Sequence, residues 1–366
     1  MTYVTKVYYP NKEKFKAYID EIYDNGWLTN NGPLVQKLEK RLEEYLGVKN
    51  LLCVTSGTVA LELAYRVLET KGEVITTPFS YVSTTSAISE TGSIPVFADI
   101  DPETFNIDPE NIEAQITDQT YAIAPCHVFG NACDIDAIDA IAKRYNLSVV
   151  YDASHAFDVT YKGQHILNYG DISAISFHAT KIFHTIEGGA IIIKDDALYE
   201  KAKVIRNHGS GGPDSVAMLG INGKMNEISA AMGLCMLDEE SSIQNDRAMS
   251  HEFYQEALQD YVQLQKRNPE ASQSLTYFPI VFQSHEEMDQ VRKALYEKEI
   301  AARQYFYPSL DTIPFVEKRM PMPRSQDLAN RILVIPMHSG VESLVVQTIQ
   351  ETLDRVRNQP TTDQPS

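Results

Sequence analysis

The feature that most constrains the fold is an alternation of short apolar runs with helical patterns from the start of the chain to about Leu237. Runs such as VITTP and AIIIK are rich in β-branched residues and have no polar face, which is typical of strands covered on both sides of a sheet. The alternation predicts an α/β fold with a doubly wound, mainly parallel sheet. The predicted strands are Leu51–Thr55, Glu73–Thr77, Ile94–Ala98, Ala122–Cys126, Ser148–Asp152, Ala174–Phe177 and Ala190–Ile193. The predicted helices are Val59–Glu69, Pro109–Gln115, Ile135–Tyr145 and Ala197–Asn207.

The pattern changes after Leu237 and predicts a smaller α+β unit. Its predicted elements are a helix over Glu239–Tyr261, the strand-like segments TYFPIVF and ILVIPM, and helices over His285–Lys298 and Glu342–Arg357. We therefore expect a large domain over residues 1–240 that includes the N-terminal segment, and a small C-terminal domain over residues 241–358. Residues 359–366 have no apolar anchor, which predicts a disordered tail.

Charge and cysteine usage narrow the class of protein. The chain carries 32 Lys and Arg against 50 Asp and Glu, a formal net charge of −18, so we expect no nucleic-acid partner. No apolar run is long enough for a membrane span, and the start MTYVTKVYYPNKEKF lacks the apolar core of a signal peptide. The four cysteines form no CxxC pair and lie mostly in apolar runs, which predicts buried free thiols and a cytoplasmic location. They are Cys53, Cys126, Cys133 and Cys235.

Four short blocks fall at the ends of predicted strands, where α/β proteins hold their ligands: TSGT at 55–58, YDASH at 151–155, SFHATK at 176–181 and EGG at 187–189. In the first block, Ser56, Gly57 and Thr58 open a helix, so their N–H groups and hydroxyls would face an anion such as a phosphate. An ordinary helix cap explains the same residues, because Ser and Thr are favoured there in any case.

The other blocks carry a carboxylate, an imidazole and an amine. Asp152 ends an apolar strand and would hold a protonated ring nitrogen, or else cap a turn. His155 would contact a phenolic oxygen, or else be a hydrogen-bonded polar residue. Lys181 follows a buried strand and would bring its amine into the same cleft for imine chemistry, although most lysines are solvated surface residues.

A metal centre is the rival interpretation of the histidines. His178 and His184 flank Lys181, while His127 and His155 lie at other strand ends. Their spacing is not HExxH, and Cys126 and Cys133 do not form a zinc knuckle. We therefore expect no metal site.

Taken together, these blocks resemble the sugar aminotransferases of the DegT/DnrJ/EryC1/StrS group, which are pyridoxal-phosphate (PLP) enzymes of fold type I. The resemblance rests on WLTNNGPLVQKLEKRL, TSGTVALELA, PFSYVSTTSAISETGSIPVFADID, APCHVFGNACDIDAI, VVYDASHAF, GDISAISFHATKIFHTIEGGAI and LGINGKMNEISAAMGLCML, in that order. It extends more loosely to ARQYFYPSL and ILVIPMHSG near the C-terminus.

The resemblance implies a PLP cofactor and a role for each matching residue. Lys181 is the lysine that bonds to the cofactor, Asp152 the partner of its ring nitrogen, and His155 the contact of its phenolic oxygen. Tyr81 takes the aromatic position that stacks on the ring. The phosphate cradle is implied at Ser56, Gly57, Thr58 and Ser176. Asn222 matches an asparagine that reaches the cofactor of the neighbouring subunit, which implies a homodimer with shared active sites.

Two departures from the family pattern concern the substrate. Gly223 and Lys224 replace an aromatic residue and an arginine, and Ser309-Leu310 replaces the Leu-His that usually follows Pro308. Lys224 and Arg303 are candidate donors to an anionic substrate. Three aromatic residues are candidates for packing on a base or sugar, although core or interface positions explain them equally well. They are Trp27, Tyr305 and Tyr307.

FHATKIFHTIEGGA and YFYPSLD look most like family members that make dTDP-4-amino-4,6-dideoxyglucose. This resemblance implies transfer of the amino group of L-glutamate to C4 of dTDP-4-dehydro-6-deoxyglucose, for O-antigen or surface polysaccharide synthesis. The alternatives are the same chemistry on a 3-keto isomer or on a UDP- or GDP-linked 4-keto sugar, a PLP-dependent sugar dehydratase, and a non-catalytic PLP-fold regulator. Family dehydratases have a histidine at the lysine position, so Lys181 argues against that activity.

Overall fold

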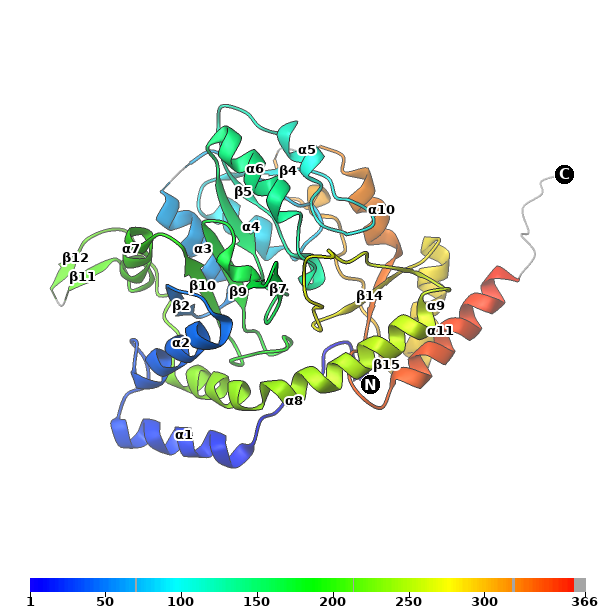
Figure 1. Cartoon of the computed structure of the whole chain (residues 1–366), viewed down its shortest axis with the longest axis horizontal. Helices are drawn as coiled ribbons and strands as arrows, with labels where there is room; N and C mark the ends of the chain where they lie inside the picture. The colour runs from blue at the N-terminus through cyan, green and yellow to red at the C-terminus, as the bar shows by residue number, and fades with distance from the viewer. Residues whose placement is uncertain (70, 213, 318–319, 359–366) are drawn as a thin grey trace.

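The central element of the molecule is a seven-stranded sheet with the order β2-β10-β9-β6-β5-β3-β4. The computed structural model describes residues 1–69, 71–212, 214–317 and 320–358 (Figure 1). The strands are β2 (Leu51–Val54), β3 (Glu73–Thr76), β4 (Ile94–Phe97), β5 (Thr120–Ala124), β6 (Ser148–Asp152), β9 (Ile172–Ser176) and β10 (Gly189–Ile193). Each corresponds to one strand predicted from the sequence. Neighbouring strands run parallel except at β10, which is antiparallel to both β2 and β9.

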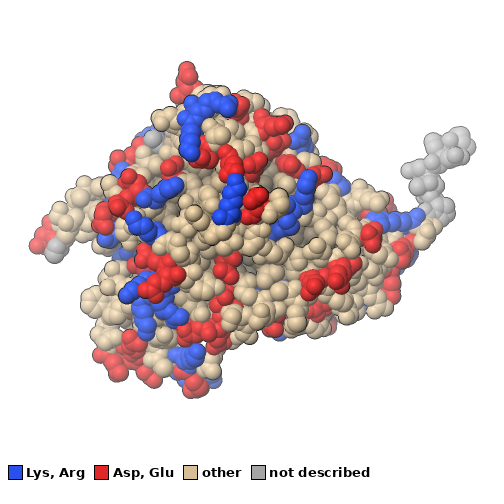
Figure 2. Space-filling model, viewed as in Figure 1, with Lys and Arg blue, Asp and Glu red and all other residues tan. Residues whose placement is uncertain are grey.

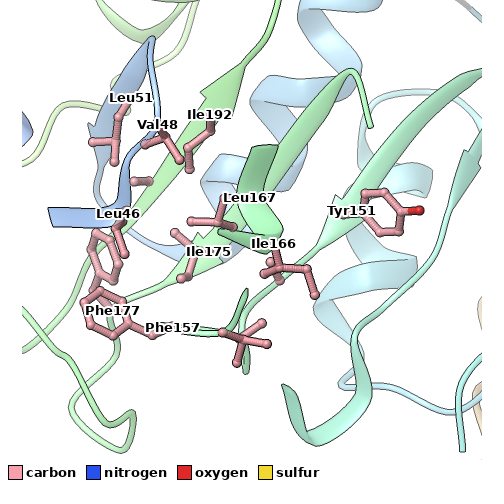
Figure 3. Close-up of a cluster of buried hydrophobic side chains, with 14 of the residues drawn as sticks. Leu46, Val48, Leu51, Tyr151, Phe157, Ile166, Leu167, Ile175, Phe177 and Ile192 are labelled. Atoms are coloured by element: carbon pink, nitrogen blue, oxygen red, sulfur yellow. The ribbon is translucent and has the colours of Figure 1, made fainter. Parts of the chain in front are cut away.

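Both faces of this sheet are buried, because successive side chains of each strand point to opposite sides. Leu51 and Cys53 pack into one apolar cluster with α2 (Pro33–Leu46), α6 (Ile135–Tyr145) and the first half of α8 (Glu227–Leu258). Part of that cluster, around Leu46, Ile175 and Phe177, is drawn in Figure 3. On the other face, Leu52 and Val54 pack with α3 (Gly57–Leu68), α4 (Ser83–Glu90) and α7 (Asp196–Arg206). Because helices cover both faces of the sheet, the strands are continuous apolar runs in the sequence.

The C-terminal part forms a second, smaller α+β unit with its own apolar core. The antiparallel sheet β13-β14-β16 consists of β13 (Gln263–Leu264), β14 (Phe278–Val281) and β16 (Ile332–Ile335). Its core includes apolar side chains of α9 (His285–Glu297) and α11 (Glu342–Arg357). The chain's first strand, β1 (Thr2–Tyr3), pairs with β15 (Ile300–Ala301), so the N-terminal residues lie beside this unit.

The remaining elements are short or peripheral. They are α1 (Lys12–Asn25), α5 (Pro109–Glu113), β7 (Thr160–Tyr161), β8 (Gln164–His165), β11 (Ser210–Gly212), β12 (Ser215–Val216), α10 (Pro323–Arg331) and three 3-10 turns at Val128–Gly130, Ile166–Asn168 and Leu310–Thr312. Cys53, Cys126, Cys133 and Cys235 are all free and buried, as predicted.

The prediction that the long helix begins near Glu239 is wrong. Helix α8 begins at Glu227 and runs from beneath the large sheet to the C-terminal unit (Figure 1). Its first turn is fixed by the side chain of Asn226, which accepts a hydrogen bond from Ser229 N at 2.8 Å. The Glu227 carboxylate accepts from the N–H groups of Leu34 and Val35 at 2.8 and 2.9 Å and so ties α8 to the start of α2. The division proposed at residue 240 falls within this helix. The tail proposed for residues 359–366 lies outside the described residues.

Charge is distributed without a dominant basic patch on the face shown in Figure 2, where Lys and Arg side chains are interspersed with Asp and Glu. Within the described residues, no helix is long and apolar enough to cross a membrane.

Candidate active site

A cavity of about 360 Å³ lies where the carboxyl ends of the parallel strands meet residues of the C-terminal unit. Its volume is within the range of small-molecule and cofactor sites. Eight of the residues proposed from the sequence for cofactor binding line it: Ser56, Gly57, Thr58, Tyr81, Asp152, His155, Ser176 and Lys181. The sheet topology brings these residues together, since they come from the ends of β2, β3, β6 and β9, which are scattered along the chain.

One end of the cavity is built from the N-terminus of α3. Ser56 caps this helix by accepting from Val59 N at 3.2 Å. The first turn of a helix leaves N–H groups without an intrahelical partner and carries positive partial charge. Gly57 packs so closely on β9 that a Cβ there would lie 2.8 Å from Cβ of Ser176. The absence of a side chain at this position brings the helix end, the Ser176 hydroxyl and the Thr58 hydroxyl around one space, which fits a phosphate group.

Asp152 lies deeper in the cavity, at the end of β6, and is 4% exposed. Its Oδ2 accepts a hydrogen bond from the hydroxyl of Thr84 at 2.7 Å, and its Oδ1 accepts from Ser154 N at 3.0 Å. One partner on each oxygen fixes the plane of the carboxylate and leaves lone pairs on both oxygens. The arrangement can therefore hold a cationic N–H group.

His155 faces the same space as a neutral ring. Burial, followed by the nearby charge of Lys181, holds the pKa of His155 well below its ordinary value. Its Nδ1 accepts from Phe129 N at 3.3 Å, so the single ring proton lies on Nε2. The ring lies nearly parallel to those of Phe129 and Phe306. A neutral imidazole with this tautomer can donate to an anionic oxygen.

Lys181 lies in the loop between β9 and β10, where its N–H donates to His178 O at 2.9 Å. Its Nζ lies 3.4 Å from the hydroxyl of Tyr277 and 5.4 Å from the centre of the Tyr277 ring. Close by, Nε2 of His178 lies 3.5 Å from Oε1 of Glu187 at the cavity wall. The loop thus directs an amine into the cavity that also holds Asp152.

The five residues proposed for substrate contact are divided by the structure. Arg303 and Tyr305 line the cavity, and the Arg303 guanidinium lies 4.7 Å from the centre of the Tyr305 ring. Trp27 and Tyr307 are 49% and 59% exposed and do not line it. Lys224 does not line it either, and its Nζ donates to Oδ1 of Asn222 at 2.9 Å.

Asn222, proposed for the neighbouring subunit's cofactor, is likewise absent from the walls of this chain's own cavity. Its segment runs beside the end of β2, where Thr55 N donates to Gly223 O at 3.0 Å. Burial, and then the charge of Arg206, lower the pKa of Lys224.

The sequence does not predict the side-chain contacts of Thr84 with Asp152 and of Tyr277 with Lys181. Thr84 lies within PFSYVSTTSA, a run of Ser and Thr in which nothing distinguishes one hydroxyl from the next. Tyr277 lies in the strand-like segment TYFPIVF, immediately before β14. Neither had a local signal, because the contact of each with Asp152 or Lys181 arises from tertiary packing. No cluster of three His, Cys, Asp or Glu that could hold a metal ion occurs in the described parts of the chain.

An amine and a carboxylate that face one cavity, beside a helix end suited to a phosphate, are the groups that PLP chemistry requires of a protein. Together with the sheet topology they define a PLP-dependent enzyme of fold type I. The chain belongs to the DegT/DnrJ/EryC1/StrS aminotransferase family, whose model matches residues 10–354. It is accordingly a PLP-dependent aminotransferase.

Two curated relatives are informative about the kind of aminotransferase. The dTDP-4-amino-4,6-dideoxy-D-glucose transaminase of Shigella dysenteriae is 39% identical over 97% of this chain and 99% of its own length. A GDP-perosamine synthase of Escherichia coli O157:H7 is 32% identical over 95% of this chain and 97% of its own length.

Solved structures with the same fold include DesI in the presence of its TDP-sugar product. DesI superposes with a TM-score of 0.89 and 29% identity over 96% of this chain and 92% of its own. The sugar aminotransferase Spr1654 of Streptococcus pneumoniae, described in its PMP form, superposes with a TM-score of 0.89 and 25% identity over 96% of this chain and 99% of its own.

Proposed function

We propose that this aminotransferase transfers the amino group of L-glutamate to C4 of dTDP-4-dehydro-6-deoxyglucose and so makes dTDP-4-amino-4,6-dideoxyglucose. The observation that carries the proposal of amino transfer is that Lys181 and Asp152 line one cavity with the anion-binding end of α3. The similarity to the Shigella dysenteriae transaminase over nearly the full length of both chains supports the substrate.

The proposed chemistry assigns one task to each residue. PLP, when bound, supplies a carbonyl carbon that takes up an amine and a protonated ring that withdraws electrons from the donor's Cα. Asp152 would hold the ring N–H with a carboxylate that Thr84 and Ser154 already orient. His155 would donate from Nε2 to the ring oxygen. Lys181 Nζ takes a proton from one carbon and returns it to another, acting as a general base and then a general acid.

The donor, the assembly and the location complete the proposal. L-Glutamate is proposed as donor from the family resemblance. A homodimer is proposed because Asn222 lies outside its own cavity and matches a residue that acts across a subunit interface in the family. Four free, buried cysteines support a cytoplasmic location. We assign the product to surface polysaccharide synthesis, the fate of such amino sugars that the resemblance implies.

A GDP-linked 4-keto sugar is the second candidate substrate. The similarity to the GDP-perosamine synthase of Escherichia coli O157:H7, at 32% identity, favours it over the remaining alternatives. The dTDP-linked sugar ranks first because the Shigella dysenteriae relative is more similar.

A substrate panel separates these candidates. The purified holoenzyme is incubated with L-glutamate and, in turn, the dTDP-, UDP- and GDP-linked 4-keto-6-deoxy sugars and the dTDP-linked 3-keto isomer. Products are identified by mass spectrometry and NMR, and kcat/KM is compared. We expect the largest value for dTDP-4-dehydro-6-deoxyglucose, with an amino group at C4. A larger value for another sugar contradicts the substrate proposal and leaves the aminotransferase activity intact. Water loss without amination identifies a dehydratase.

A further inference from the structure

Tyr277 is a side chain of the C-terminal unit whose hydroxyl contacts the amine of Lys181. Its hydroxyl lies 3.4 Å from Lys181 Nζ, and the same Nζ lies 5.4 Å from the centre of its ring. Within the described residues, no carboxylate forms an ion pair with Lys181, so the Tyr277 hydroxyl is the group that holds the amine. This hydrogen bond favours a defined position of Nζ.

The position of Tyr277 is itself fixed by contacts with both parts of the molecule. Its ring packs edge-on against His155, with centroids 5.2 Å apart and an interplanar angle of 86°, and the side chain is 5% exposed. The backbone before it is held by Arg247 of α8, whose Nη1 donates to the carbonyls of Leu275 and Thr276 at 3.2 and 3.1 Å. The Thr276 hydroxyl donates to His155 O at 3.0 Å.

We propose that Tyr277 is a positioning residue that keeps Nζ of Lys181 in one place in the cavity, where it would transfer a proton, whenever this amine is not bonded to the cofactor. The inference rests on the proposed function, in which Lys181 moves a proton. A lysine side chain that is not bonded to a cofactor has four rotatable bonds, so its Nζ would otherwise sample many positions. A phenol suits this task because it can accept from an ammonium group and donate to a neutral amine, so it can hold Nζ in either protonation state. Misplacing a proton-transfer group lowers the rate of that step without weakening the binding of the donor.

Tyr277→Phe removes the hydroxyl and keeps the ring, so it tests the hydrogen bond alone. We expect the rate of the glutamate half-reaction at saturating donor to fall about 10- to 100-fold, the range for losing one hydrogen bond to a charged group. KM and Tm stay close to the wild-type values. The kinetic isotope effect for glutamate deuterated at Cα increases, because proton transfer limits the rate more strongly. The apoprotein should also attach PLP to Lys181 more slowly, as followed by visible absorbance with no donor present.

Tyr254→Phe is the matched control. Tyr254 is a buried tyrosine whose hydroxyl donates to Pro336 O at 2.9 Å, and it does not line the cavity. Removal of the Tyr254 hydroxyl should change neither the isotope effect nor the rate of PLP attachment. The inference is overturned if Tyr277→Phe matches wild type in rate and isotope effect, or if its rate falls with an unchanged isotope effect and unchanged PLP attachment. If the wild type does not use glutamate, the proposed donor is wrong, and the rate of PLP attachment still decides whether Tyr277 positions Lys181.

Discussion

The hydroxyl of Thr84 donates a 2.7 Å hydrogen bond to Oδ2 of Asp152, and both residues are buried. The same hydroxyl oxygen lies 2.7 Å from that of Ser80. Thr84 belongs to α4 and Asp152 to β6, so the bond links a helix to the strand end that carries the carboxylate. It fixes which lone pair of Asp152 faces the cavity.

Thr84→Val should therefore lower kcat about tenfold, a loss of about 1.4 kcal/mol of transition-state stabilisation. Asp152 would keep only its bond from Ser154 N, and its carboxylate could rotate. Thr84→Ser keeps the hydroxyl and should stay close to wild type. Thr85→Val is the matched control, because the neighbouring Thr85 hydroxyl is buried and has no hydrogen-bond partner among the described residues. Steady-state kinetics of the four proteins test the claim, and equal activity of Thr84→Val and Thr85→Val would refute it.

Asp152→Asn should reduce kcat by several orders of magnitude while PLP remains bound. A neutral amide does not stabilise a protonated ring nitrogen, and the ring then withdraws electrons poorly. Asp195→Asn, a change of the same chemistry at the N-cap of α7, should have little effect. A fall in kcat smaller than about tenfold, or about 1.4 kcal/mol, would make Asp152 a structural residue.

Buried neutral histidines should lower the free energy of unfolding as the solution becomes more acidic. Burial lowers the pKa of His127 from 6.5 to about 3. At pH 5 the unfolded chain therefore binds a proton at His127 that the folded protein does not, so the free energy of unfolding falls as pH drops below about 6.5. Between pH 7 and pH 5 this group should account for a loss of about 2 kcal/mol.

His127→Asn removes that titration while leaving the other groups in place. Asp158, whose pKa burial raises to about 6, changes stability in the opposite direction over this range, but it is present in both proteins and cancels in the comparison. Urea unfolding at one fixed protein concentration should show a loss from pH 7 to pH 5 that is about 2 kcal/mol smaller in the variant. Equal losses in the two proteins would mean that His127 is protonated in the folded state.

Asn222 should act on the active site of the partner subunit. Mixed dimers of Lys181→Ala and Asn222→Ala then contain one intact site, because the Asn222→Ala subunit supplies Lys181 and receives Asn222 from its partner. Activity should recover when the two inactive proteins exchange subunits. Mixed dimers of Lys181→Ala and Asp152→Asn are the control, since both residues line the cavity of one chain and no intact site can form. Absence of recovery in verified mixed dimers of the first pair would contradict the shared site.

The sequence predicts the sheet well and the contacts between units poorly, for a physical reason. Each of the seven strands is buried on both faces and so leaves an apolar run that can be read locally. Helix α4, in contrast, reads STTSAISE, and its Ser and Thr residues are weak helix formers that tertiary packing holds in place. Helix α8 begins before the predicted residue because the Glu227 carboxylate accepts hydrogen bonds from N–H groups at the start of α2, which is far away in the chain.

In the candidate site, too, the sequence indicates residues within short local blocks but not contacts between the two units. The sequence indicates Lys181, Asp152 and Ser56 as candidates because each ends or follows a strand within a short block, and parallel strands bring their carboxyl ends together. Tyr277 comes from the other unit, and its contact with Lys181 spans 96 positions of sequence. No spacing rule connects residues that meet only after two units dock.

The most direct test of the central claim is to reduce the holoenzyme with borohydride and locate PLP by peptide mass spectrometry. If Lys181 carries the cofactor, reduction should fix PLP on the peptide that contains Lys181, and Lys181→Ala should show no such label. Incubation with L-glutamate before reduction should abolish the label, because the amino group has then been transferred and Lys181 is free. Fixation of PLP on another lysine, or labelling of Lys181 that glutamate leaves unchanged, would contradict the account.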